Sequence, residues 1–153
     1  MDVEALRVAL AAPLTDGGDG DMPALRALVT GAEDGLVATA GPRYFGFVVG
    51  GTVFFVADDG TNGHELWRSD GTPGGTVMVK NIGPAATDGN PFELTAAGST
   101  LFFGASDGTN GYELWKSNGT DAGTVMVEDL NPAGDSNAER FAALGSIALF
   151  VAA

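Results

Sequence analysis

The chain has 153 residues, enough for one domain or two small ones, and its 44% hydrophobic content can build a core. Its 24 glycines and 7 prolines, together about a fifth of the sequence, favour many turns over long helices. Twenty acidic and seven basic residues give a net charge of −13, spread along the chain, which makes nucleic acid and anionic membranes poor partners.

Several function classes are excluded by residues that the sequence lacks. There is no cysteine, so disulfides, thiolate metal sites and a cysteine nucleophile are ruled out. No apolar run approaches the roughly 20 residues that span a bilayer, and we expect no membrane span. The N-terminal residues lack a basic stretch followed by a long apolar one, so no secretory signal peptide is visible.

The first 50 residues are predicted to form a short α-helical segment that ends in a strand. Leucines four residues apart favour a first helix, ending near Pro13, and the acidic, glycine-rich stretch 16–21 is expected to be a loop. A second helix is expected to begin at Asp21, with Pro23 in its first turn, and to end at 33–35. Tyr44–Val49 is predicted to be a strand.

From Thr52 onward the sequence repeats with a period of about 48 residues. Thr52–Pro84 aligns with Thr100–Pro132 without a gap, and 21 of the 33 paired residues are identical. The match resumes after one deleted residue, and a third copy begins near Ser146. We therefore predict a helical segment at 1–50, one repeat at 51–98, a second at 99–145 and the start of a truncated third at 146–153.

Each repeat contains four short strand-like stretches separated by turns rich in glycine and asparagine. The predicted strands are Val53–Ala57, His64–Arg68, Thr76–Lys80 and Phe92–Ala97, then Leu101–Ala105, Tyr112–Lys116, Thr124–Glu128 and Glu139–Leu144. Four antiparallel strands in fewer than about 50 residues match the size of one β-propeller blade. We predict a mainly β fold of tandem four-stranded repeats, propeller-blade-like but incomplete, whose open strand edges favour self-association.

The second predicted strand of each repeat, together with the turn after it, carries a specific string. Residues 65–72 read Glu-Leu-Trp-Arg-Ser-Asp-Gly-Thr, and residues 113–120 read the same except for Lys116 and Asn118. This string resembles the ELWxxDGT family, also described as hyalin-like, found in large secreted or surface proteins of bacteria. The resemblance implies a propeller-like architecture, a secreted or cell-surface location, and a binding or adhesive role towards a protein or carbohydrate. It implies no particular ligand and no enzymatic activity.

A second resemblance covers about residues 1–52: the predicted helices fit it, and residues 35–52 carry its most specific string. Their sequence, Gly-Leu-Val-Ala-Thr-Ala-Gly-Pro-Arg-Tyr-Phe-Gly-Phe-Val-Val-Gly-Gly-Thr, is similar to the N-terminal region of group II pyridoxal-phosphate-dependent amino acid decarboxylases. In that family the cofactor-binding lysine, acid and histidine come later in the chain, and none has a counterpart here. The alternative function is thus a catalytically incompetent remnant of such an enzyme, without its cofactor. A genuine fusion and an artefactual join at Val49–Thr52 both remain open.

Two tryptophans and two glutamates stand at matching repeat positions. Trp67 and Trp115 are expected to pack in the core or between blades, as repeated large side chains commonly do, and the alternative is an aromatic platform for a sugar. Glu65 and Glu113 share a strand face with them. A glycosidase-type pair of carboxylates needs a separation of about 5–10 Å across one substrate, so structural roles are favoured.

The loops after the first strand of each repeat contain Asp59 and Asn62, and Asp107 and Asn110. We expect Asx-type turn hydrogen bonds there, and a weak calcium site is the alternative. The EF-hand pattern does not fit, because counting from Asp58 places glycine at position three instead of six. No catalytic residue and no further cofactor is predicted.

Overall fold

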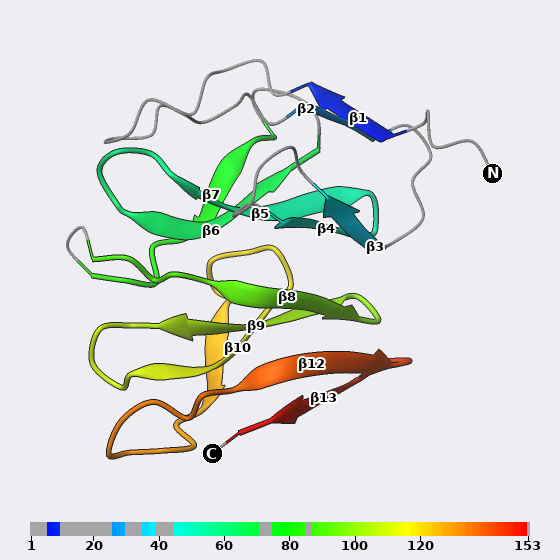
Figure 1. The fold of residues 1–153 in the computed structure, drawn as a ribbon. Coiled ribbons are helices and arrows are strands. Elements are labelled where there is room, and N and C mark those ends of the chain that lie inside the picture. Colours follow the sequence, from blue (N-terminus) through cyan, green and yellow to red (C-terminus); the bar gives the residue numbers. More distant parts are fainter. Residues whose placement is uncertain are drawn as a thin grey trace.

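The computed structural model of the chain describes residues 6–9, 26–29, 35–38, 45–70, 75–84 and 87–152. All the regular elements in these ranges are β-strands, and every paired neighbour runs antiparallel (Figure 1). The predicted mainly β fold of antiparallel sheets is therefore confirmed. Within the described residues the sheets close into neither a barrel nor a ring, and no helix there is long and apolar enough to cross a membrane.

The strands form two large sheets and two hairpins. The first large sheet contains, in order, β3 (Gly35–Ala38), β4 (Phe45–Val49), β5 (Thr52–Asp58), β6 (His64–Ser69) and β7 (Val77–Lys80). The second contains β8 (Phe92–Ala97), β9 (Thr100–Ser106), β10 (Tyr112–Ser117) and β11 (Val125–Glu128). The hairpins are β1 (Leu6–Ala9) with β2 (Arg26–Val29), and β12 (Glu139–Leu144) with β13 (Ile147–Val151). Successive strands are neighbours throughout, so each sheet is a simple meander.

The second sheet begins one strand earlier than its repeat in the sequence, and the first sheet, which starts at β3, begins two strands earlier. By sequence β8 ends the first repeat, yet it pairs with β9, which opens the second. In the same way β4 pairs with β5, and β12 pairs with β13. The cause is local: each pair is joined by a two-residue turn whose first residue is a glycine with positive φ, namely Gly50 (56°), Gly98 (61°) and Gly145 (62°). Strands β4 to β7 of the first sheet correspond to β8 to β11 of the second. The first of these strands, β4, comes from the N-terminal segment and not from the repeat.

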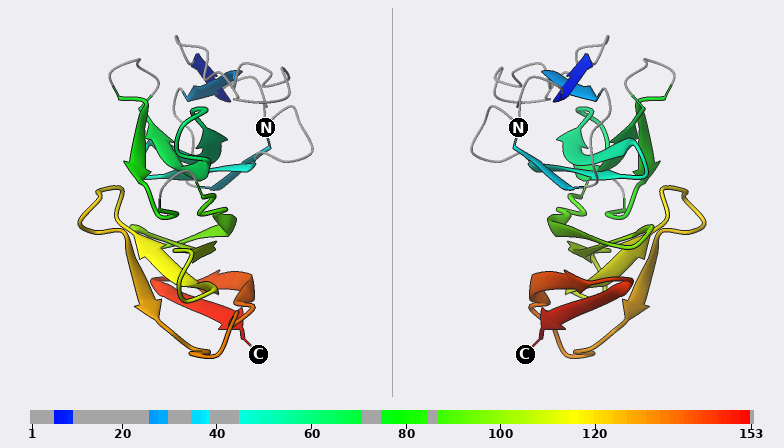
Figure 2. Two further views of the ribbon diagram at one scale, coloured as in Figure 1. Left: turned by 90° about the vertical axis from the view of Figure 1, so that its left-hand side faces the viewer. Right: turned by 90° about the vertical axis from the view of Figure 1, so that its right-hand side faces the viewer.

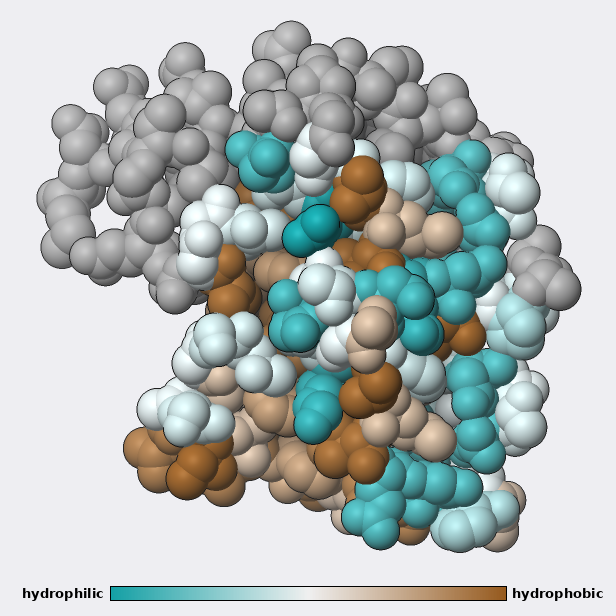
Figure 3. All heavy atoms as spheres, turned by 180° about the vertical axis from the view of Figure 1, so that it is seen from behind, coloured by the Kyte–Doolittle hydropathy of each residue, from teal (hydrophilic) through white to brown (hydrophobic). Residues whose placement is uncertain are grey.

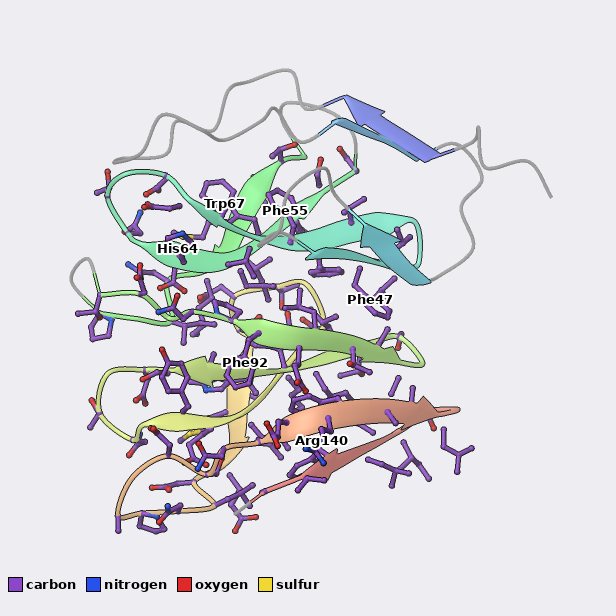
Figure 4. All side chains as sticks on the ribbon, viewed as in Figure 1. Phe47, Phe55, His64, Trp67, Phe92 and Arg140 are labelled. Atoms are coloured by element: carbon purple, nitrogen blue, oxygen red, sulfur yellow. The ribbon has the colours of Figure 1, made fainter. Side chains whose placement is uncertain are left out.

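The two large sheets and the C-terminal hairpin stack one over the next (Figure 2). Contacts between them run mainly through β4, β8 and β12, the strands that occupy equivalent places in the three layers. The main core lies between the two sheets and unites buried residues of both: Val49, Phe54, Leu66, Val79, Ile82, Leu101, Phe103, Ala105 and Trp115. Phe47 of β4 packs against this core from the side of the first sheet (Figure 4).

The α-helical N-terminal segment predicted from the sequence is not supported. The described parts of the two expected helices are the strands β1 and β2, which pair from Leu6↔Val29 to Ala9↔Arg26. The physical reason is that an apolar run of four residues fits a strand as well as a helix, and antiparallel pairing satisfies its backbone groups. The expected loop at 16–21, the helix end at 33–34, positions 71–72 of the repeated string and Ala153 lie outside the described residues.

Candidate functional site

Glu65 lies on β6 with its side chain fully buried. Its carboxylate accepts three backbone N–H bonds from the loop after β7: from Ile82 at 2.9 Å, from Gly83 at 2.9 Å and from Gly89 at 3.1 Å. Burial raises the pKa of Glu65, although these three hydrogen bonds act in the lowering direction. The carboxylate therefore anchors a loop of its own repeat, and its oxygens are already occupied.

Glu113 repeats this arrangement on β10 and is also fully buried. Its oxygens accept the N–H of Leu130 at 2.9 Å and the N–H of Ser136 at 3.0 Å. Each glutamate is thus bonded to the loop that follows in its own repeat. This is the structural role that the sequence favours for a repeated acid.

Trp67 and Trp115 are buried between strands. The two residues are 9% and 6% exposed, and each stands opposite a phenylalanine in the register: Trp67 pairs with Phe55 (Figure 4), and Trp115 pairs with Phe103. Neither indole N–H finds an acceptor among the residues that the structure describes. Rings with so little exposed area offer no open face on which a sugar could stack, and their contacts are those of core residues.

The loop between β5 and β6 is closed by an aspartate. One carboxylate oxygen of Asp59 accepts the N–H groups of Thr61 and Asn62, both at 2.9 Å, and the other accepts the Asn62 amide at 2.7 Å. The bond from the Asn62 backbone is the main cause of the lowered pKa of Asp59. These are Asx-turn contacts.

Asp107 and Asn110 form the same turn between β9 and β10, with bonds of 2.7 to 2.9 Å. Partial burial by itself would raise the pKa of Asp107, but the hydrogen bonds from Asn110 and Thr109 outweigh it and lower the pKa. No group of three or more histidines, aspartates or glutamates that could hold a metal occurs in the described part of the chain. Calcium at these turns stays a prediction from the sequence.

A second pair of aspartates, not singled out from the sequence, clamps the start of the Glu-Leu-Trp strand. Asp88 accepts the His64 N–H at 2.7 Å, and Asp135 accepts the Tyr112 N–H at 2.8 Å. The His64 backbone bond is the main cause of the lowered pKa of Asp88. The 47-residue spacing of the two aspartates in the aligned loops is the signal from which this pair could have been found.

The first strand of each later layer is kinked. Among the described residues, four non-glycine residues have positive φ, and they fall at two equivalent positions: Asn90 (43°) and Asn137 (49°), Glu93 (51°) and Arg140 (58°). The last two lie where the register of β8 and of β12 shifts, as at a β-bulge. The Glu93 carboxylate accepts the backbone N–H groups of Arg140 and Phe141, so it ties one kink to the next layer.

An open cavity of about 410 Å³ lies beside this kink, lined by Asn90, Pro91, Phe92, Tyr112, Asn137 and Glu139. The rings of Phe92 and Tyr112 meet edge to face at 5.8 Å, and the Asn90 amide donates to the Tyr112 hydroxyl at 3.3 Å. Aromatic edges, amides and a carboxylate can bind a small polar molecule. The Asn90 amide and the Tyr112 hydroxyl already bond each other, and Glu139 pairs with Arg140 at 3.5 Å, so the lining by itself does not define a ligand.

The hairpin β12–β13 presents apolar side chains to solvent. Leu144, Ile147, Leu149 and Val151 are 67%, 58%, 54% and 51% exposed, and Phe150 is 37% exposed. In the view from behind, apolar side chains gather at the lower left corner of the molecule, where the turn between β12 and β13 lies (Figure 3). An apolar patch of this kind typically marks an interaction surface.

Comparison of the chain with protein-family models, with curated proteins and with solved structures found no match. Function is therefore inferred from the internal repeat and from the geometry of the described residues.

Proposed function

We propose that the chain is a non-enzymatic binding or scaffold module that acts through its C-terminal hairpin. One comparison carries the proposal. Phe55, Phe103 and Phe150 stand at the same position of three successive layers, and they are 1%, 0% and 37% exposed. Among the described residues, the side chain at this position is thus more exposed in the C-terminal hairpin than in the two sheets, and exposed apolar side chains of this kind are typical of surfaces that pack against another polypeptide.

Two further observations support the proposal. The polar residues at the repeated positions, Glu65, Glu113, Asp59 and Asp107, are bonded within their own loops, as anchors of a scaffold would be. The resemblance of the Glu-Leu-Trp string to the ELWxxDGT family points to binding or adhesion at a cell surface. Stacking through β4, β8 and β12 favours a propeller-like plan, in which each sheet is one blade.

The alternative interpretation of the first 52 residues, a remnant of a pyridoxal-phosphate decarboxylase, gains no support from the described residues. Lys80 donates to the Asp121 carbonyl oxygen at 3.2 Å and to its carboxylate at 3.3 Å, as a link between repeats. Val48, in the strand of that resemblance, is fully buried in the first sheet, where the strand serves the packing of the repeats.

Sedimentation velocity over a concentration series tests the proposed function. The wild-type chain should associate reversibly in the micromolar range, and Leu149→Lys should shift it to monomer because a charge is placed in the apolar face. Val127→Lys is the matched control: Val127 is 43% exposed on β11, and the variant should behave as wild type. A compact wild-type monomer that also fails to bind an apolar fluorescent dye would contradict the proposal.

A further inference from the structure

The sequence contains three asparagines that are followed by glycine: Asn62, Asn110 and Asn118. In such a pair the backbone nitrogen of the glycine can attack the side-chain amide carbon of the asparagine, and glycine has no Cβ to obstruct the approach. The product is a cyclic imide, which water later opens to a carboxylate. The hydrogen bonds around each asparagine decide which of the three the fold leaves reactive.

Asn62 and Asn110 are restrained by an acidic neighbour. Each is half-buried, and its amide nitrogen donates to a carboxylate at 2.7 Å, Asn62 to Asp59 and Asn110 to Asp107. Attack on the amide carbon places negative charge on the amide oxygen, and a carboxylate so close opposes that charge. The same hydrogen bond holds the nitrogen that has to leave. Both asparagines should therefore react slowly.

Asn118 is bonded in the opposite sense. It is exposed between β10 and β11, and its amide oxygen accepts the Thr120 N–H at 3.0 Å and the Thr120 hydroxyl at 2.7 Å. That hydroxyl accepts the Gly123 N–H at 3.0 Å, which directs its hydrogen to Asn118. The Asn118 amide nitrogen donates to no group among the residues that the structure describes. Two donors on the oxygen that gains charge stabilise it as an oxyanion hole does, and the nitrogen can depart as ammonia.

We propose that Asn118 is a site of spontaneous deamidation in the folded protein. A bond forms between the Gly119 nitrogen and the Asn118 side-chain carbon, the Gly119 nitrogen gives its proton to water, and the bond to the amide nitrogen breaks with release of ammonia. A water molecule then opens the imide at either carbonyl and leaves aspartate or isoaspartate. Water is the co-reactant, and nothing is oxidised or reduced. This inference does not depend on the proposed binding function.

The first repeat shows that a carboxylate fits at this place. Asp70 stands at the equivalent position of the first string, and a Cβ on Gly75 would clash with its carboxylate, as a Cβ on Gly123 would clash with the Asn118 amide. The two side chains therefore fill the same space beside equivalent glycines. Conversion of Asn118 to aspartate would give the second repeat the Asp-Gly-Thr sequence of the first. Isoaspartate would lengthen the main chain and distort the turn.

The test is a time course of the folded full chain at neutral pH, in which peptide mapping by mass spectrometry measures the carboxylate formed at each asparagine. We expect it to accumulate at Asn118 at least about tenfold faster than at Asn62 or Asn110. In urea, where the hydrogen bonds are lost, the three rates should become similar. Asn118 itself should react faster there, because the Gly119 N–H donates to Ser117 Oγ at 2.9 Å in the fold and this bond must break as the proton leaves.

Two variants of Thr120 separate the effect of the turn from that of the Asn-Gly pair. Thr120→Ser keeps both donors, and its Asn118 should react like that of wild type. Thr120→Val removes the hydroxyl donor and keeps the N–H, so Asn118 should react about fivefold or more slowly. In urea both variants should match wild type, because the pair itself is unchanged.

Equal rates at the three asparagines of the folded chain, or a slower rate at Asn118, would overturn the proposal. A folded Thr120→Val chain that deamidates as fast as wild type would overturn the role given to the two donors. If circular dichroism shows that Thr120→Val does not fold, the comparison of the three asparagines in the wild-type chain still decides the question.

Discussion

At the scale of single residues, the repeated string is explained by the loop that follows it. A buried carboxylate on β6 or β10 collects backbone N–H groups that would otherwise lack partners away from water. Glutamate suits this position because it accepts several bonds at once and carries no donor of its own. The string therefore encodes a fold-specific anchor, and its acid need not be catalytic.

Replacing either glutamate by glutamine should lower stability, and the loss should be larger where the carboxylate accepts more backbone N–H groups. Glu65→Gln turns an NH₂ group towards backbone N–H donors, and we expect the free energy of unfolding to fall by about 2–3 kcal/mol. Glu113→Gln should cost less, since Glu113 accepts two loop bonds where Glu65 accepts three. Urea denaturation measures both, with exposed Glu128→Gln as the control. Losses below about 0.5 kcal/mol in both variants would refute the anchoring role.

The hydrogen bond from the His64 N–H to Asp88 predicts that the stability of the fold depends on pH in the acidic range. The folded-state pKa of Asp88 lies below the ordinary value of 3.8, so its contribution to stability is present above that value and is lost as the pH falls through the lowered pKa. Glu65 acts in the opposite direction at higher pH, because its raised pKa favours the protonated form in the folded state. Denaturation between about pH 5 and pH 2 should therefore show a shallower loss of stability in Asp88→Asn than in wild type. If the free energy of unfolding had the same pH dependence in both proteins, protonation of Asp88 would not be coupled to folding.

At the scale of elements, β8 fits against β9 because a glycine makes room for an aromatic ring. A Cβ on Gly104 would clash with the Phe92 ring, and Phe92 is paired with Gly104 in the register. Valine stands at the equivalent position of the other layers, as Val56 and Val151. The close fit of ring and glycine is thus particular to the second sheet.

Filling this space should strain the second sheet. We expect Gly104→Ala to lower the free energy of unfolding by about 1–3 kcal/mol, since the Phe92 ring must move away from Tyr112. The control is Gly134→Ala, because a Cβ there meets nothing within 4 Å, and its effect should stay within about 0.5 kcal/mol. In a Phe92→Ala background the cost of Gly104→Ala should largely disappear. Simple additivity of the two changes would be evidence against the contact.

The elements also show how far the sequence could lead. The repeat predicts β5 to β12, because its alternating residues and glycine turns act locally, whereas β4 is predicted from its own sequence outside the repeat and β3 is not predicted. It does not predict that β8 pairs with β9 of the next repeat instead of with a strand of its own repeat. This pairing is favoured because a two-residue turn at Gly98 joins β8 to β9, whereas a long loop separates β8 from β7. Nor could it predict the kinks at Glu93 and Arg140, since neither residue favours positive φ by itself. The N-terminal helices were expected from apolar runs too short to distinguish the two periods.

At the scale of the whole molecule, the chain is a stack in which each layer covers the one before it. The layers repeat the same hairpin, and the equivalent phenylalanine is buried in the two large sheets, as Phe55 and Phe103, but partly exposed in the C-terminal hairpin, as Phe150. With more exposed side chains, the C-terminal hairpin is expected to be the layer least protected against hydrogen exchange.

Residue-resolved amide hydrogen exchange of the dilute, monomeric chain tests this account most directly. The amides of Phe55 and Phe103 should be protected by about a thousandfold or more, because each is expected to bond the strand beside it, whereas the amide of Phe150 should exchange within about tenfold of the unfolded rate. Protection of Phe150 equal to that of Phe103 would mean that the C-terminal hairpin is protected as well as the large sheets are, and would contradict the binding surface proposed on it.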